Sequence, residues 1–192
     1  YWGEQPFFDG AVERFITDET AAINALLAGD IDAISSVAGA GLDQLAGIDA
    51  EEGFKVVVPA AVQVNWLYLN PTLDKYQDQK VRMAVAHAID HQALLAVGVR
   101  GYGSINCLPV VPYLAPYNTG ECPYEYDPDL ARDLLTQAGA EGMEIHFSYP
   151  VTGEFPPIAE VVVQELNAVG FSATSEGIDN ATYIDQVWKG GD

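Results

Sequence analysis

Two histidines stand four positions apart in the segment VRMAVAHAIDH, at His87 and His91. On a single helix this spacing places both imidazoles on one face, as in the zinc-binding pair of the HExxH motif. The hydrolytic motif also needs a glutamate directly after the first histidine as general base, but here Ala88 follows His87. Nothing in the sequence supports His146 as a third ligand. We therefore interpret the pair as surface histidines and predict no metal site.

Other arrangements that carry catalysis are missing from the sequence. There is no GxSxG segment for a serine nucleophile. The GYG stretch at 101–103 stands in a predicted loop and not between a strand and a helix, so it does not predict a glycine-rich phosphate-binding loop. Because the chain has 28 Asp and Glu residues, any pair of carboxylates is expected by abundance alone and does not indicate glycosidase activity. We predict no catalytic residues, no cofactor and no enzymatic activity.

The remaining candidates for function are aromatic and polar side chains at predicted strand ends and in loops. They are Trp66, Tyr68, Tyr149, Phe155 and Asn180. Aromatic rings at the mouth of a cleft combine apolar area with a polar edge, which suits small ligands of varied chemistry. For Trp66, packing in the core against the following helix is the alternative interpretation.

Trp66 and Tyr68 belong to the segment VQVNWLYLN, residues 62–70, around which the chain is organised. Side chains alternate with a period of two, and both faces are apolar from Trp66 onward, which predicts a strand covered on two sides. After Pro71, apolar residues recur at helical spacing from Val81 to Leu95. We expect one helix there, and we place the change from one lobe to the next at the strand.

The rest of the chain predicts further strands and helices in alternation, which is typical of an α/β layer with parallel strands. Helix 21–28 has Thr17 or Asp18 as its cap and Gly29 as its end, and helix 128–137 begins at Asp127 or Pro128. The other predicted helices are 42–45, 158–168 and 181–189, and the other predicted strands are 12–16, 31–34, 54–58, 143–149 and 171–176.

The formal net charge of −20 comes from 28 acidic and only eight basic residues. This balance argues against a nucleic-acid partner, because phosphate binding requires Lys and Arg. The acidic residues are interpreted either as a solvated surface that keeps the protein dispersed or as adaptation to high salt. Hydrophobic residues make up 49% of the chain, enough for a folded core, and the two long uncharged runs contain Pro, Asn or Gly and do not predict membrane spans.

The segment LYLNPTLDKYQDQKVRMAVAHAIDHQALL resembles a pattern of the family 5 extracellular solute-binding proteins, xxLNxxxxxxxDxxVRxAxxxAIDxxxLL. These proteins are receptors of peptide- and nickel-type ABC importers. The resemblance continues in order along nearly the whole chain, through YWGEQPFFDGAV, TAAINALLAGDIDAI, GYGSINCLPVVP, YDPDLARDLLTQAG and YIDQVWKGGD. Each piece is weakly specific, whereas the ordered set is strong.

The resemblance implies an α/β fold, part of a two-lobed periplasmic-binding-protein-like architecture of type II, peptide-binding class. Residues 1–61 would end the first lobe, 62–70 would be the crossing strand, and 71–192 would begin the second lobe. The implied function is extracytoplasmic capture of a peptide for an ABC permease, with affinity arising from lobe closure. Alternatives are a nickel or metal-chelate receptor of the same fold and an enzyme or interaction module on this scaffold.

The resemblance also implies a location and a set of ligand contacts. We expect a monomeric, periplasmic or extracellular protein, membrane-associated at full length, of which this chain is an internal fragment that binds ligand weakly by itself. In the family, the position of Trp66 points into the cleft, and the segment from Tyr149 to Phe155 lines it. Asn180 stands where many members have Trp, which suggests a roomier or more polar pocket. The acidic residue that holds a peptide amino group would lie beyond Asp192.

Cys107 and Cys122 are the only cysteines, fifteen positions apart in a proline-rich predicted loop. An even, isolated pair in an exported protein predicts a disulfide, and two free thiols are the alternative. The CxxC spacing of redox-active cysteines is absent, so thiol–disulfide oxidoreductase chemistry is not expected.

Overall fold

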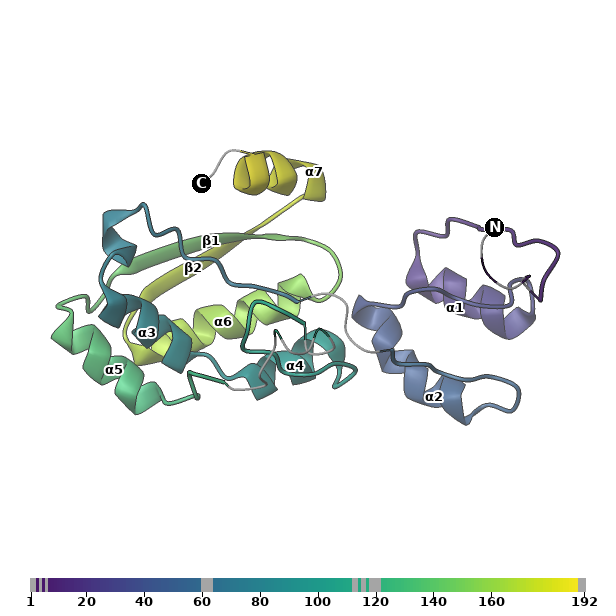
Figure 1. The fold of residues 1–192 in the computed structure, drawn as a ribbon, viewed down its shortest axis with the longest axis horizontal. Coiled ribbons are helices and arrows are strands. Elements are labelled where there is room, and N and C mark those ends of the chain that lie inside the picture. The colour runs from purple at the N-terminus through teal and green to yellow at the C-terminus, as the bar shows by residue number, and fades with distance from the viewer. Residues whose placement is uncertain are drawn as a thin grey trace.

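The computed structural model describes residues 7–59, 64–111 and 122–189, with the single residues 3, 5, 114 and 117. Its clearest unit is formed by β1 (Glu144–Pro150), α6 (Phe155–Val169) and β2 (Ser172–Ile178). The two strands pair in parallel, from Glu144 opposite Ser172 to Pro150 opposite Ile178. Between them, α6 carries the chain back along the sheet, as Figure 1 shows. The predicted parallel α/β arrangement is confirmed for this part of the chain.

The hydrophobic core lies where α6 meets the sheet and the neighbouring helices. α3 (Gln79–Ala88) packs against α5 (Pro128–Gln137), and both contact α6, as does α4 (His91–Val99). Leu135 and Leu166 are almost completely buried at this junction. Further core residues are Tyr76, Val81, Ala84, Val85, Ala131, Ile145, Val162 and Phe171. This core fixes α6 and the strands whose ends are discussed below.

The N-terminal part consists of α1 (Glu19–Ala28), a 3-10 helix η1 (Gly39–Gln44) and α2 (Leu45–Ala50). In Figure 1 it lies at the opposite end of the molecule from α5. The predicted ends of the first helix are confirmed. The Asp18 carboxylate accepts a hydrogen bond from the backbone N–H of Ala21, and Gly29 ends the helix in the left-handed region with φ 77°.

Aspartates at helix starts account for part of the acidic composition. In five helices the residue before the first turn is an aspartate whose side chain accepts hydrogen bonds from backbone N–H groups of that turn. These are Asp18, Asp78, Asp90, Asp127 and Asp179. A carboxylate here satisfies N–H groups that have no partner within the helix and lies at the positive end of the helix dipole.

Four predicted strands are wrong for the residues that the structure describes. Residues 12–16, 31–34, 54–58 and 64–70 lie outside any ladder, and 62–63 lie outside the described residues. Trp66 and Tyr68 are exposed, so the expected cover on both faces is missing. A strand becomes regular only when a neighbour pairs with it, and in the described ranges β1 and β2 are the only strands.

The single helix predicted from Val81 to Leu95 is also wrong, because it is divided into α3 and α4. Ile89 is extended, with φ −102° and ψ 121°. The Asp90 side chain then accepts hydrogen bonds from the N–H groups of Gln92 and Ala93, at 2.8 and 3.4 Å, and starts a new helix. His87 and His91 therefore belong to different helices, and the single-helix basis for a zinc pair disappears.

The last predicted helix is present with mixed geometry. α7 (Asn180–Tyr183) continues into a π-helical segment, Ile184–Lys189.

Over the ranges described, the helices are too short or too polar to traverse a bilayer.

Candidate functional site

Three of the five predicted site residues lie at element ends that share one edge of the sheet. β1 and β2 are parallel, so their carboxyl ends lie side by side. Tyr149 is near the end of β1, Phe155 begins α6 after the following turn, and Asn180 begins α7 after β2. In open α/β sheets, ligands bind outside the carboxyl ends of the strands. We call this the carboxyl edge.

Gly177 makes room for the Tyr149 side chain at this edge, and sequence reasoning missed it. The two residues are register partners on adjacent strands. A Cβ atom added to Gly177 would lie 3.2 Å from both Cζ and Oη of Tyr149 and 2.6 Å from Cγ1 of Val151. The tyrosine ring therefore lies across β2, where a larger residue would displace it. A glycine within a strand pattern is the available sequence signal for such a close approach.

Asn180 is exposed, whereas the side chain of its neighbour Asp179 is held by hydrogen bonds. The Asp179 carboxylate accepts hydrogen bonds from the Thr182 hydroxyl at 2.5 Å and from the backbone N–H groups of Ala181 and Thr182 at 3.1 Å. These bonds, chiefly the one from the Thr182 hydroxyl, lower the pKa of Asp179 below its ordinary value. Asp179 is therefore engaged in the start of α7, whereas the Asn180 amide faces solvent.

Trp66 and Tyr68 reach the same region along an extended segment. The Asn65 amide donates a hydrogen bond to Glu154 Oε1 at 3.0 Å, and the Lys75 ammonium donates to the backbone carbonyl of Glu144 at 3.0 Å. The segment 65–75 thus runs antiparallel beside β1 and begins at the carboxyl edge (Figure 1). Trp66 is 45% exposed, with its ring centroid 6.1 Å from that of Tyr68. This exposure disfavours the core interpretation of Trp66.

A concave region, which we call the hollow, lies next to the carboxyl edge and has a volume of about 350 Å³. Its walls come from three stretches: the loop and helix after α1, the end of α4, and the turn into α6. The lining residues are Ser36, Val37, Ala38, Leu42, Val99, Tyr102, Thr152, Gly153, Glu154 and Phe155. Of the five predicted residues, Phe155 alone is among them. Sequence reasoning missed the others because the three stretches are far apart in the chain.

Two interactions hold the wall of the hollow that comes from the N-terminal part. The Glu19 carboxylate accepts hydrogen bonds from the N–H groups of Ala38 and Gly41, at 3.0 and 3.1 Å. Arg100 Nε donates to Asp43 Oδ1 at 2.6 Å, which joins the end of α4 to η1. The hydrogen bond from Arg100 lowers the pKa of Asp43. Glu19 thus fixes the backbone of Ala38, a lining residue, and Arg100 fixes η1 beside it.

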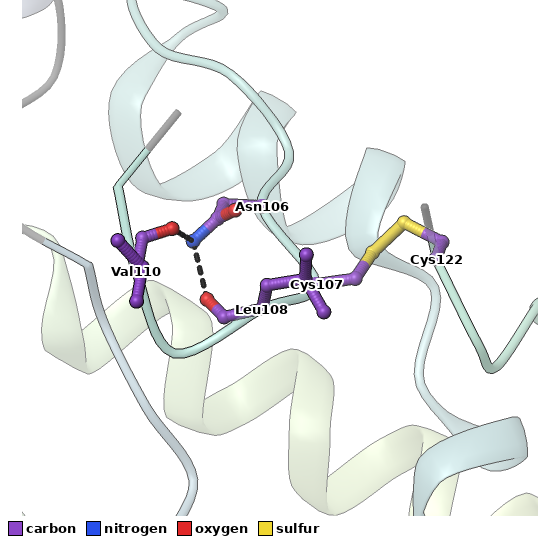
Figure 2. The surroundings of a disulfide bond; sticks show 5 residues. All are labelled: Asn106, Cys107, Leu108, Val110 and Cys122. Atoms are coloured by element: carbon purple, nitrogen blue, oxygen red, sulfur yellow. Dashed lines mark hydrogen bonds between the residues drawn. A yellow bond between two sulfur atoms is a disulfide. The ribbon is translucent and has the colours of Figure 1, made fainter. Parts of the chain in front are cut away.

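The predicted disulfide is confirmed. Cys107 and Cys122 are bonded, with their Cα atoms 5.0 Å apart (Figure 2). On the Cys107 side, the Asn106 amide donates hydrogen bonds to the carbonyls of Leu108 and Val110, at 2.6 and 3.2 Å, and shapes the turn after the cysteine. The bond ties this turn to the segment that leads into α5.

The histidines have structural roles or lie apart from the hollow. His87 is buried, so its interpretation as a surface histidine is wrong. Its Nδ1 atom is 2.7 Å from the Glu125 carbonyl, and its own carbonyl accepts a hydrogen bond from Asp127 N–H at 2.9 Å. His146 Nδ1 is 3.0 Å from the Thr174 hydroxyl on the exposed surface of the strands. Within the described residues, no group of three side chains that could hold a metal ion is found. His87 therefore positions the segment after the disulfide.

Comparison with known proteins gives a consistent result. A family described as bacterial extracellular solute-binding proteins, family 5 Middle, matches residues 1–192. A Brucella ovis protein named as an ABC transporter peptide-binding protein is 30% identical over the whole chain, which covers 36% of that relative. The chain therefore spans about a third of the length of this relative.

Two solved structures show the same fold. DppA, an ABC transporter-associated periplasmic binding protein from Helicobacter pylori in complex with the peptide STSA, has a TM-score of 0.79 and 26% identity. The match covers 97% of this chain and 36% of DppA. NikA from Brucella suis in complex with Fe(III)-EDTA has a TM-score of 0.73 and 24% identity, with coverage of 100% of this chain and 41% of NikA. The periplasmic-binding-protein-like fold expected from the sequence is therefore confirmed.

Proposed function

Because the chain belongs to the bacterial extracellular solute-binding proteins of family 5, we propose that it forms one wall of a peptide-binding cleft in the receptor of an ABC importer. The observation that carries this proposal is the gathering of Tyr149, Phe155 and Asn180 at the carboxyl edge. Trp66 approaches the same edge through the bond between Asn65 and Glu154. The peptide-binding name of a 30% identical relative supports it.

The groups at the carboxyl edge suit reversible capture of a peptide. Exposed aromatic rings bury apolar ligand area at a small cost in side-chain entropy, and their polar atoms orient the ligand. We assign the contacts with apolar ligand groups to Trp66, Tyr68, Tyr149 and Phe155, and contacts with polar groups to Asn180. Binding by closure of two lobes would add contacts from the opposite side of the cleft. We place the change of lobe at residues 62–70.

In this proposal the receptor works outside the cytoplasm, as a membrane-associated monomer, and passes its peptide to the importer permease. A metal-chelate receptor is the second candidate, because NikA shares the fold. None of the three histidines is among the described residues that line the hollow, and His87 is buried against Glu125, which favours the peptide.

Calorimetric titration of the full-length protein with two probes separates these candidates. We expect the peptide Ser-Thr-Ser-Ala, which DppA holds in its solved complex, to bind with a dissociation constant in or below the micromolar range, because DppA shares the fold of this chain. Fe(III)-EDTA should give no saturable heat. Binding of the chelate without binding of the peptide would contradict the proposal and favour the second candidate. Binding of neither would contradict both.

A further inference from the structure

Among the described residues that line the hollow, Glu154, at the turn into α6, is the single charged one. The side chain is partly buried, and its Oε1 atom accepts one hydrogen bond from the Asn65 amide at 3.0 Å. A carboxylate has about four acceptor positions, so this bond leaves capacity for a further donor. Ser36, Tyr102 and Thr152, which carry hydroxyl groups, belong to the same lining. A group with several N–H donors matches such a set of acceptors.

The start of α6 is unsuited to an anion, although helix starts commonly bind anions through free backbone N–H groups. Pro156 and Pro157 occupy the first turn and have no N–H. The N–H of Ile158 is directed to the Glu154 carbonyl at 3.4 Å. Phe155 is therefore the only one of the first four helix residues whose backbone N–H is neither missing nor directed to another group. The helix thus offers little to a carboxylate or phosphate group.

Basic side chains give no counter-charge inside the hollow. Its described lining contains neither lysine nor arginine. Arg100 lies between two lining residues, Val99 and Tyr102, but its guanidinium is paired with Asp43 at 2.6 Å. A negative ligand group placed in the hollow would therefore face the Glu154 carboxylate without compensation. A positive group would instead be attracted to this carboxylate.

We propose that the hollow receives a positively charged nitrogen group of the ligand, an ammonium or guanidinium, against the Glu154 carboxylate. This inference rests on the proposed function and deepens it by assigning a preference for peptides with a basic side chain at this position. The group is a basic side chain, because the resemblance assigns the peptide amino terminus to an acidic residue beyond Asp192. Val37, Leu42, Val99 and Phe155 provide apolar walls along which a lysine-like stem can lie.

The walls of the hollow are preorganised by interactions within the protein. Glu19 holds the backbone of Ala38 and Gly41, and a Cβ atom on Gly41 would lie 2.7 Å from both Glu19 Oε2 and Val37 Cγ1. Asn65 holds one oxygen of Glu154. A binding group whose partners already fix it loses less entropy on binding, which favours affinity.

The test uses four tripeptides with the full-length protein: Ala-Lys-Ala, Ala-norleucine-Ala, and the N-acetyl form of each. Norleucine keeps the stem of lysine and removes the ammonium, whereas acetylation removes the charge of the terminus. Loss of the charge that occupies the hollow should weaken binding by about tenfold, as for a hydrogen bond to a charged group. In Glu154→Gln, which keeps an acceptor for Asn65, the same loss should change affinity by less than about twofold.

Glu160→Gln is the matched control, because Glu160 is an exposed residue of the same helix and outside the lining. It should keep the tenfold effect and thereby exclude a general effect of net charge. The norleucine change should be the one whose effect Glu154→Gln removes. If Glu154→Gln instead removes only the effect of acetylation, the amino terminus occupies the hollow and this inference is overturned. Equal effects of both changes in the parent and Glu154→Gln would overturn this inference while leaving the proposed function intact. Failure of all four peptides to bind would overturn the proposed function, and this inference with it.

Discussion

Replacing both Cys107 and Cys122 by serine is expected to lower the free energy of unfolding by about 3 kcal/mol. The disulfide closes a loop with a sequence separation of 15. Opening it returns conformational freedom to the unfolded chain, and this loss of restraint is the main source of the effect in the chain-entropy description. For a chain of this size the melting temperature should fall by about 6–12 °C.

Urea unfolding followed by circular dichroism measures this change, with thermal melts in parallel. The oxidised parent treated with a thiol reductant is the matched comparison, because it should unfold like the double serine variant. The variant itself should not respond to the reductant. Identical unfolding midpoints for the parent with and without reductant would show that the bond contributes nothing to stability.

Trp66→Ala is expected to weaken Ser-Thr-Ser-Ala binding by the full-length protein by about 1–3 kcal/mol, the range of a truncated aromatic anchor. The corresponding rise in the dissociation constant is about 5- to 150-fold. Trp66 is 45% exposed and stands next to Asn65, which is bonded to Glu154 at the edge of the hollow. Because the side chain is not in the core, the melting temperature should change little.

Calorimetric titration and a thermal melt of the same sample separate ligand contact from packing. Tyr126→Ala is the control, since Tyr126 is 48% exposed and precedes α5, outside the hollow and the carboxyl edge. It should leave affinity unchanged. A large fall in melting temperature for Trp66→Ala, with affinity per folded molecule retained, would make Trp66 a core residue and contradict the assignment.

The elements that could be predicted from sequence are those with local signals. Asp18 and Gly29 mark the two ends of α1 through capping chemistry within a few residues. The pattern of strand, proline-initiated helix, glycine and strand predicted β1, α6 and β2, because a short connection through a helix favours parallel pairing. In each of these cases the residues that decide the structure are neighbours in the chain.

The predictions that failed concern elements whose structure depends on distant partners or on competing local signals. Residues 64–70 have the alternation of a strand, but a ladder needs a neighbouring strand that alternation cannot supply. The division between α3 and α4 was missed because apolar periodicity continues across Ile89 and hides the capping signal of Asp90. An aspartate before a run of helix formers could have indicated that boundary.

The candidate site likewise has residues that could be predicted from the sequence and residues that could not. Tyr149, Phe155 and Asn180 could be selected because each follows or ends a predicted strand, and parallel strands bring such positions to one edge. Glu154 and the rest of the hollow could not, since residues around 36–42, 99–102 and 152–155 meet only in the folded chain. Their types are ordinary, and no spacing connects them.

The central claim is that the carboxyl edge of β1 and β2 is a wall of the ligand cleft. Hydrogen–deuterium exchange of the full-length protein, with and without saturating Ser-Thr-Ser-Ala, tests it most directly. We predict slower exchange on peptide binding at residues 64–68, 149–155 and 177–183, and unchanged exchange at residues 139–144, which precede and begin β1 at the opposite edge. Protection at residues 139–144, or saturated binding without protection at the carboxyl edge, would contradict this account.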